Sequence, residues 1–310
     1  MSKERIIFLG TPDLASNCLS GLVENGFNIV AVITKEDKVR SRNNKIEESP
    51  VAIKAKELNI PVFKPHKIKD IYQEIKDLNP DLLLTFAYGQ IIPDEILALS
   101  KYKPLNLHGS LLPKYRGASP MQTCLYNGDK ETGVTLMEMV HEMDAGDIYA
   151  SESFKIEDDD NYSSITEKIA SCGLLVATKY LPLYFENELQ PLKQDIEKVT
   201  FTHRISKEEE HLSLEKGTYD FINQVRSLSF TPGGYLLFND INIKVYKASY
   251  YSNKIDGEVG QIILAKKKLI VLQLKDGQVN LDLLQRPGKK MMSSADFNNG
   301  MKDFEGVILK

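Results

Sequence analysis

An asparagine and a histidine two residues apart form the part of this sequence best suited to chemistry. Asn106 and His108 lie in the segment NLHGSLLPKYRGASP, at the end of an apolar run. In an extended strand, residues i and i+2 point to the same face, so the amide and the imidazole can be aimed at one spot. An acidic loop, HEMDAGDIY, follows about 35 residues later. An amide donor, an imidazole and a carboxylate that converge can stabilise a tetrahedral acyl intermediate and move its protons.

The acidic loop offers two carboxylates for this role. Asp144 and Asp147 lie on either side of Gly146, which permits a tight turn, and their spacing leaves both open as partners of the histidine. A lone histidine in a strand is more often structural, but the nearby asparagine and the Ser-Leu-Leu-Pro turn favour a catalytic His108. We expect His141 to be solvated, because it lies two residues into a polar loop.

Apolar runs alternate with helical patterns over the first 189 residues. Strands are predicted at residues 5–10, 27–34, 61–63, 81–87, 104–110, 132–140 and 147–156. Helices are predicted around residues 14–22, 51–58, 71–78, 93–99 and 162–185. This order is typical of an α/β fold with a mostly parallel sheet and helices on both faces. Ligands of such sheets bind beyond the carboxyl ends of the strands, where Tyr88, His108 and Asp144 are expected.

The pattern changes after Leu189. A polar segment, residues 190–207, is interpreted as a linker between a catalytic domain (1–189) and a C-terminal domain (208–310). In the latter, a helix at 219–228 precedes closely spaced β runs, which predicts a small antiparallel barrel of the OB type, a common nucleic-acid platform. At 310 residues and 42% apolar composition, the chain is long enough for two cores.

The charge is distributed unevenly between the two parts. The net charge of −4 argues against a general nucleic-acid binder, but residues 211–310 hold 14 Lys/Arg and 10 Asp/Glu, a net +4. The first 210 residues hold the other 25 and 33, a net −8. This asymmetry suggests a polyanionic partner for the C-terminal domain, although the ordinary abundance of surface lysine explains it equally well.

The spacing of the cysteines, the short apolar run at the N-terminus and the residues after the first glycine each argue against a class of protein. Cys18, Cys124 and Cys172 show no CxxC pairing, which argues against a disulfide framework and a zinc site and for a reducing compartment. The apolar run of MSKERIIFLG is too short for a signal peptide or a membrane span, so we expect a cytoplasmic protein. GTPD (10–13) lacks the GxGxxG fingerprint, which disfavours a dinucleotide site.

Motifs along the whole chain resemble those of the methionyl-tRNA formyltransferase family. In the first domain they are GTPD, the SPV after the charged loop, AYGQIIP (87–93), NLHGSLLPKYRGASP, ETGVT (131–135) and MDAGD. In the second they are RISKEEE (204–210), FTPGGY (230–235) and RPGKKMMSSADF (286–297). The Asn-x-His-Gly-Ser-Leu-Leu-Pro core is typical of folate-dependent formyltransferases generally, and the C-terminal segments narrow the resemblance to the tRNA enzymes.

The resemblance implies a Rossmann-like domain followed by an OB-like domain, with Asn106, His108 and Asp144 as the catalytic trio. It implies 10-formyltetrahydrofolate as formyl donor and co-substrate, and initiator methionyl-tRNA as acceptor. We expect no metal, because nothing in the chain offers a cluster of ligands. The residues implied to hold the folate are Tyr88, Gly89, Gln90, Ile91, Ser110, Leu111, Leu112 and Pro113. We expect a monomer by default.

The charged loop, residues 35–49, is long for a connection between a strand and a helix, and its basic side chains could meet phosphates or be solvated. In the family that the chain resembles, this loop enters the acceptor end of the tRNA, which implies tRNA contacts for Arg40, Arg42 and Lys45. The loop reads Ser-Arg-Asn-Asn-Lys here in place of the family's Gly-Arg-Gly-Lys-Lys, so it is less basic.

Four alternatives share parts of this pattern. A nucleotide-sugar formyltransferase or a formyltetrahydrofolate hydrolase could carry the same trio, but neither small acceptor needs a basic C-terminal domain of about a hundred residues. A non-catalytic tRNA-binding protein is disfavoured by the intact trio, and a nicotinamide dehydrogenase by the missing glycine fingerprint.

Overall fold

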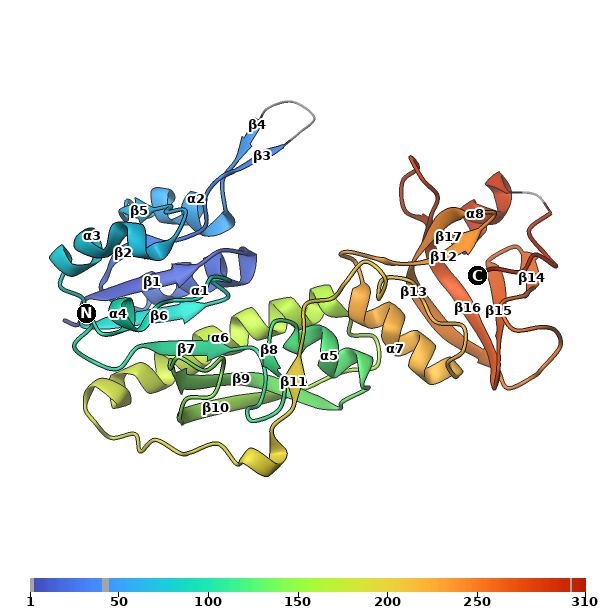
Figure 1. Ribbon diagram of the computed structural model, residues 1–310. Coiled ribbons are helices and arrows are strands. Elements are labelled where there is room, and N and C mark those ends of the chain that lie inside the picture. Colours follow the sequence, from blue (N-terminus) through green and yellow to red (C-terminus); the bar gives the residue numbers. More distant parts are fainter. Residues whose placement is uncertain (1–2, 41–44, 302) are drawn as a thin grey trace. The chain divides into compact units, whose positions relative to one another are not determined.

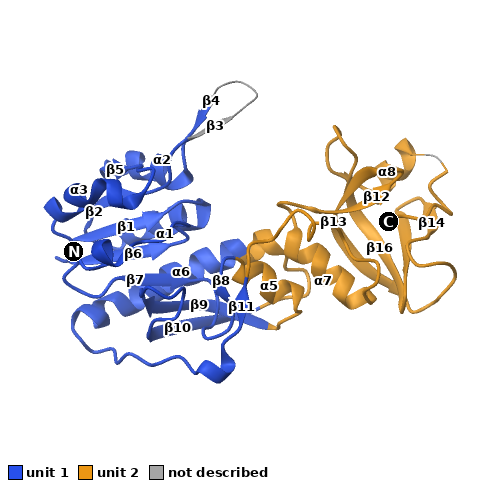
Figure 2. Ribbon diagram, viewed as in Figure 1, with its two compact units in different colours: residues 1–118, 131–155, 166–202 blue, residues 119–130, 156–165, 203–310 orange. Residues whose placement is uncertain are grey.

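The computed structural model describes residues 3–40, 45–301 and 303–310, with the backbone alone for residues 38–40 and 45. The chain divides into two compact units (Figure 2). Unit 1 comprises residues 1–118, 131–155 and 166–202, and unit 2 comprises residues 119–130, 156–165 and 203–310.

Unit 1 is built on a seven-stranded sheet in the order β10-β9-β7-β6-β1-β2-β5. The strands are β1 (Ile6–Gly10), β2 (Ile29–Ile33), β5 (Val62–Phe63), β6 (Leu82–Phe86), β7 (Leu105–His108), β9 (Glu131–Glu138) and β10 (Ile148–Lys155). From β5 to β7 the neighbours are parallel, and β9 pairs antiparallel with both β7 and β10. The predicted mostly parallel sheet is therefore confirmed.

Helices cover both faces of this sheet (Figure 1). They are α1 (Asp13–Glu24), α2 (Pro50–Glu57), α3 (Tyr72–Asp77) after the 3₁₀ turn η1 (Ile68–Ile71), α4 (Asp94–Leu97) and α6 (Tyr162–Phe185). Because alternate residues of a strand point to opposite faces, Ile7 and Leu9 of β1 pack with side chains of α3 and α4. On α1, Gly21 lies so close to Leu174 of α6 that a Cβ would overlap the leucine.

The order of the strands places the topological switch point of the sheet between β1 and β6. From β1 the chain builds outward to β2 and β5, then returns to add β6 on the other side of β1. Ligands of doubly wound sheets bind at such a switch point, beyond the carboxyl ends of the strands. At that end, the Thr11 hydroxyl donates a hydrogen bond to the carbonyl oxygen of Tyr88, 3.0 Å away, and so joins the segments that follow the two strands.

The charged segment between β2 and α2 contains a hairpin that the sequence pattern did not predict. Strands β3 (Lys38–Arg40) and β4 (Lys45–Glu47) pair antiparallel and project as an arm in Figure 1. Ile46 in β4 is 63% exposed. Periodicity arises when one face of a strand is buried, and a ribbon with an exposed apolar side chain lacks that signal. The helix after it starts as predicted, because the Ser49 hydroxyl accepts a hydrogen bond from Ala52 N.

Unit 2 contains an antiparallel sheet in the order β12-β13-β16-β15-β14, with β17 paired to β16. Its strands are β12 (Gly234–Phe238), β13 (Ile241–Ser252), β14 (Ile262–Lys266), β15 (Leu269–Leu274), β16 (Gly277–Gln285) and β17 (Met292–Ser293). Its helices are α5 (Pro120–Tyr126), α7 (Thr218–Leu228) and α8 (Ser294–Gly300). The predicted C-terminal domain of short antiparallel strands is confirmed.

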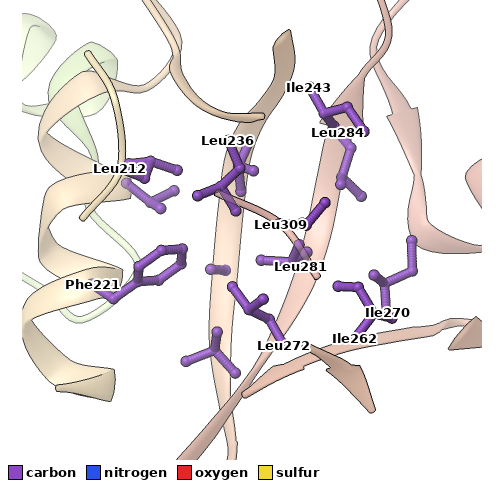
Figure 3. Packing of buried hydrophobic residues seen from close by; sticks show 14 of the residues in the cluster. Leu212, Phe221, Leu236, Ile243, Ile262, Ile270, Leu272, Leu281, Leu284 and Leu309 are labelled. Carbon is purple, nitrogen blue, oxygen red and sulfur yellow. The ribbon is translucent and has the colours of Figure 1, made fainter. Parts of the chain in front are cut away.

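One apolar core joins α7 to this sheet. Figure 3 shows Phe221 of α7 pointing toward Leu236 and Leu272 of the strands, and all three side chains are fully buried. Segments far upstream in the chain belong to the same unit. The Arg226 side chain of α7, for example, donates hydrogen bonds to the carbonyl oxygens of Asp160 and Glu157.

Candidate active site

His108 ends β7 and is buried, with its side chain 6% exposed. Its Nε2 lies 2.9 Å from the carbonyl oxygen of Tyr115. Because that oxygen can only accept, Nε2 carries a hydrogen, and Nδ1 is the nitrogen left for chemistry. Nδ1 lies 3.6 Å from Oδ2 of Asp144. With a hydrogen also on Nδ1, the imidazolium could donate to an anionic oxygen while the carboxylate offsets its charge.

Asp144 is held in a tight turn between β9 and β10. Its backbone has φ of +52°, in the left-handed region that non-glycine residues seldom adopt. Its Oδ2 accepts a hydrogen bond from Gly117 N at 2.8 Å, and its side chain is 15% exposed. The carboxylate therefore faces the imidazole of β7 from the loop that connects β9 and β10.

The other candidates in that loop lie elsewhere. Asp147 lies near Lys103, whose pKa is raised mainly by its hydrogen bond to Glu138 and to a lesser degree by Asp147. His141 is 90% exposed and lies 3.6 Å from the carboxylate of Asp94. Of the two carboxylates that spacing left open, the structure brings Asp144 to His108.

Asn106 has a partner that the sequence pattern did not reveal. Thr85 of β6 pairs with Asn106 of β7, and its hydroxyl lies 2.6 Å from the amide oxygen. A hydroxyl that donates to Oδ1 leaves the Nδ2 hydrogens free for another acceptor, two residues before the imidazole. The available signal was one hydroxyl residue in the apolar run DLLLTFA. Thr85 therefore sets the direction of the amide.

The eight residues predicted to hold a folate differ in accessibility. Tyr88, Ser110 and Leu112 are buried, and burial raises the pKa of Tyr88 to about 12. The Ser110 hydroxyl donates to Lys114 O, and Leu112 N donates to the Thr135 hydroxyl. These three residues shape the two loops from within.

The remaining five are at least partly accessible: Gly89, Gln90, Ile91, Leu111 and Pro113. Ile91, in the segment that follows β6, is 85% exposed, and Gly89 has φ of +74°. An accessible apolar side chain beside backbone polar groups suits a flat heteroaromatic ring with a hydrogen-bonding edge. The binding of the folate by these eight residues stays a prediction.

The predicted tRNA contacts lie mostly beyond what the structure describes. Arg42 lies outside the described residues, and Arg40 and Lys45 are described by their backbone alone. The hairpin that contains Arg40 and Lys45 is anchored at its base. Lys64 contacts the carboxylate of Asp37 at 2.8 Å and that of Glu48, so one cation joins both ends of the hairpin.

The ion pairs at this base alter the titration of their members. The ammonium groups of Lys56 and Lys64 lower the pKa of Glu48 to about 2. Burial lowers the pKa of Lys64, but its hydrogen bonds to Asp37 and Glu48 outweigh that effect and leave it raised.

No group of three or more His, Cys, Asp and Glu side chains that could hold a metal ion occurs in the described part of the chain. Within the same residues, no helix combines the length and the apolar character needed to cross a membrane.

Comparison with known proteins assigns the family. The formyl transferase family model matches residues 4–177, and the model of the formyl transferase C-terminal domain matches residues 204–302. The chain is 39% identical to the methionyl-tRNA formyltransferase of Malacoplasma penetrans over 308 residues, which cover 99% of this chain and 97% of that protein. It is also 39% identical to the enzyme of that name from Sulfurihydrogenibium sp., with 96% and 97% covered.

Solved structures share the fold at lower identity. HypX from Aquifex aeolicus in complex with tetrahydrofolic acid matches with a TM-score of 0.67 and 19% identity, over 98% of this chain and 49% of that one. WlaRD, a sugar 3N-formyltransferase, matches with a TM-score of 0.67 and 22% identity, over 94% and 100%. These two likenesses concern the fold, whereas the sequence identity extends over both domains of the named relatives. The chain therefore belongs to the methionyl-tRNA formyltransferase family.

Proposed function

We propose that this chain transfers the formyl group of 10-formyltetrahydrofolate to the free amino group of initiator methionyl-tRNA. The observation that carries the proposal is the approach of Asp144, from the loop between β9 and β10, to His108, which lies two residues after Asn106 in β7, in a chain of this family. The chain matches the two named methionyl-tRNA formyltransferases over nearly their whole length.

In the proposed mechanism, the asparagine and the histidine stabilise the charge that develops on the formyl oxygen. The amine attacks the formyl carbon, the carbonyl oxygen becomes anionic, and the bond from carbon to N10 of the folate then breaks. Nδ2 of Asn106 is free to donate because Thr85 occupies the amide oxygen. Nδ1 of His108 is the second donor when the ring carries both hydrogens. Preorganised donors of this kind act most strongly in a site that excludes water.

Asp144 supports the histidine and participates in proton transfer. Its carboxylate oxygen Oδ2 is 3.6 Å from Nδ1, a contact between opposite charges when the ring carries both hydrogens, and too long for a direct hydrogen bond. A water or the attacking amine can contact both groups from one side. The attacking amine must lose a proton, and this carboxylate receives it directly or through a water.

We further propose that the tRNA is held by phosphate contacts and shape. Residues 211–310 carry a net charge of +4, and the sequence of the charged loop, residues 35–49, contains the basic residues Arg40, Arg42 and Lys45. Phosphate contacts position a nucleic acid without reading its sequence, which suffices to present a 3′ end. A cytoplasmic location is proposed because the three cysteines are buried free thiols, as expected in a reducing compartment.

A formyl-transfer assay with and without the tRNA tests this proposal. We expect rapid formation of formylmethionyl-tRNA from 10-formyltetrahydrofolate and charged initiator tRNA, and its loss in His108→Ala. The matched control is His141→Ala, because that histidine is 90% exposed and should leave the rate unchanged. Folate release in water without tRNA modification would identify a hydrolase instead. Normal turnover of His108→Ala would refute the assigned role of the imidazole.

A further inference from the structure

We infer that Gln194, in the segment that follows α6, is a positioning residue for Asp144. The inference rests on the proposed function, since it assigns Gln194 the task of holding a member of the proposed catalytic trio. Residues 190–198 are all exposed except Gln194, whose side chain is half-buried. A single polar side chain turned inward from an exposed segment indicates a specific contact.

The contacts of Gln194 surround the turn that presents Asp144. Its amide nitrogen donates to the carbonyl oxygens of Asp144 and Gly146, both at 2.8 Å. Its amide oxygen accepts from Nε of Arg116 at 3.0 Å, and Arg116 is buried. Both hydrogens of the amide nitrogen and the amide oxygen are thus used, in an arrangement that a shorter or apolar side chain cannot reproduce.

The turn requires such support because its backbone is strained and tightly packed. Asp144 holds φ at +52°, and a non-glycine residue persists there only when its surroundings over-determine it. A Cβ on Gly146 would lie 2.0 Å from the carbonyl oxygen of Glu138, so this turn lies directly on β9. Without a donor, the carbonyl oxygens of Asp144 and Gly146 would have to seek water, and the carboxylate would lose its fixed direction.

The same segment also contacts the opposite side of the catalytic pair. The Thr200 hydroxyl accepts from Tyr115 N at 2.9 Å, and the carbonyl oxygen of Thr200 accepts from Arg116 N at 2.9 Å. The carbonyl oxygen of Tyr115 is in turn the acceptor for Nε2 of His108. The segment from Gln194 to Thr200 therefore holds the supports of both His108 and Asp144, although its sequence suggests only a linker.

A simpler role for Gln194 would be only to accept the hydrogen bond from Nε of Arg116. The two roles make opposite predictions for glutamate. Gln194→Glu retains the acceptor for Arg116 and adds a charge that favours that contact, but it replaces the donor to Asp144 O and Gly146 O with a repelling oxygen. If Gln194 served only Arg116, glutamate would be harmless. If it positions Asp144, glutamate is at least as damaging as Gln194→Met, which removes all three bonds.

The experiment measures kcat for formyl transfer to methionyl-tRNA and the dissociation constant of tetrahydrofolate for Gln194→Glu and Gln194→Met. Gln190→Glu makes the same chemical change at an exposed position in the segment and serves as control. We expect kcat to fall about 10- to 100-fold in both Gln194 variants, as small misplacements of catalytic groups do, with folate affinity within about twofold of wild type. Retained folate affinity shows that the unit carrying the site has folded.

Each outcome supports or overturns the inference. Near-normal kcat in Gln194→Glu, with a fall in Gln194→Met, would overturn it in favour of a role at Arg116 alone. Equal loss of kcat and folate affinity would overturn it in favour of general support of the fold. Asp144→Asn, assayed in parallel, separates the two proposals. If that variant turns over normally, the proposed function of Asp144 fails, whereas a defective Asp144→Asn beside a normal Gln194→Glu overturns only the positioning role.

Discussion

Replacing Thr85 with valine should slow formyl transfer, although Thr85 is not among the residues proposed to contact the substrate. Valine has nearly the shape of threonine, so the buried position on β6 stays filled and only the hydroxyl is lost. That hydroxyl lies 2.6 Å from Oδ1 of Asn106 and is the contact that directs Nδ2 toward the site. The change therefore tests whether the orientation of one amide limits the rate.

The size of the effect follows from the atoms around the lost hydroxyl. The hydroxyl also lies 3.3 Å from the carbonyl oxygen of Leu105 and 3.3 Å from the sulfur of Met139, both of which are acceptors. Without the hydroxyl, the amide of Asn106 loses a hydrogen bond of about 0.5–1.5 kcal/mol. If the amide then flips, its NH₂ group can donate weakly to these two acceptors. A net preference of about 1–2 kcal/mol against the productive orientation corresponds to a fall in kcat of about 5- to 30-fold.

The assay is single-turnover formyl transfer for Thr85→Val and Thr85→Ser, with thermal unfolding of both variants. Serine retains the hydroxyl and loses a methyl group, so it controls for the change in packing. We expect Thr85→Ser to retain most of the rate and Thr85→Val to lose it, with a stability loss near 1 kcal/mol in either variant. A kcat of Thr85→Val within about twofold of that of Thr85→Ser would refute the reasoning.

Three further predictions concern the trio, the partner and the arm. Asn106→Ala should lower turnover by ~10²–10³, because it removes the proposed oxyanion donor. Its melting temperature should change little, because the lost side chain is only half-buried; steady-state kinetics and calorimetry measure both. Affinity for tRNA should fall steeply between low and physiological salt while tetrahydrofolate affinity changes little, and equal salt slopes in the two titrations would contradict phosphate docking. The pKa of Glu48 is lowered to about 2, so its ion pairs are complete above its ordinary value of 4.5 and are lost as pH falls toward 2. An NMR titration of the Glu48 carboxyl should therefore show a midpoint near 2, and one near 4.5 once Lys56 and Lys64 are both replaced by methionine.

The elements of both units follow closely from local patterns. Apolar strands such as residues 5–10 and 81–87 were predicted and are confirmed as β1 and β6, because a strand buried on both faces must be apolar throughout. The long helix predicted at 162–185 is confirmed as α6. The arm of β3 and β4 was missed, since an exposed hairpin buries no face and leaves no periodic signal.

Only part of the candidate site can be predicted from the sequence. Asn106 and His108 are two residues apart, and the pleat of a strand alone brings their side chains to one face. The choice between Asp144 and Asp147 depended on the resemblance to a family, because a turn with glycine can present either carboxylate. The position of the Asp144 carboxylate is set by the turn, where Asp144 adopts φ of +52° and its Oδ2 accepts a hydrogen bond from Gly117 N.

The supports of the trio are decided by tertiary structure. Thr85 lies 21 residues from Asn106, and Gln194 lies 50 residues from Asp144. Neither pair has a sequence signature, because a threonine in a strand and a glutamine in a polar segment are ordinary residues until the chain brings them to their partners. Local periodicity specifies which residues are extended, helical or turning, since those choices depend on neighbours along the chain. Which amide, carbonyl or hydroxyl completes a hydrogen bond depends on strand order and loop packing, and these exist only in the folded molecule.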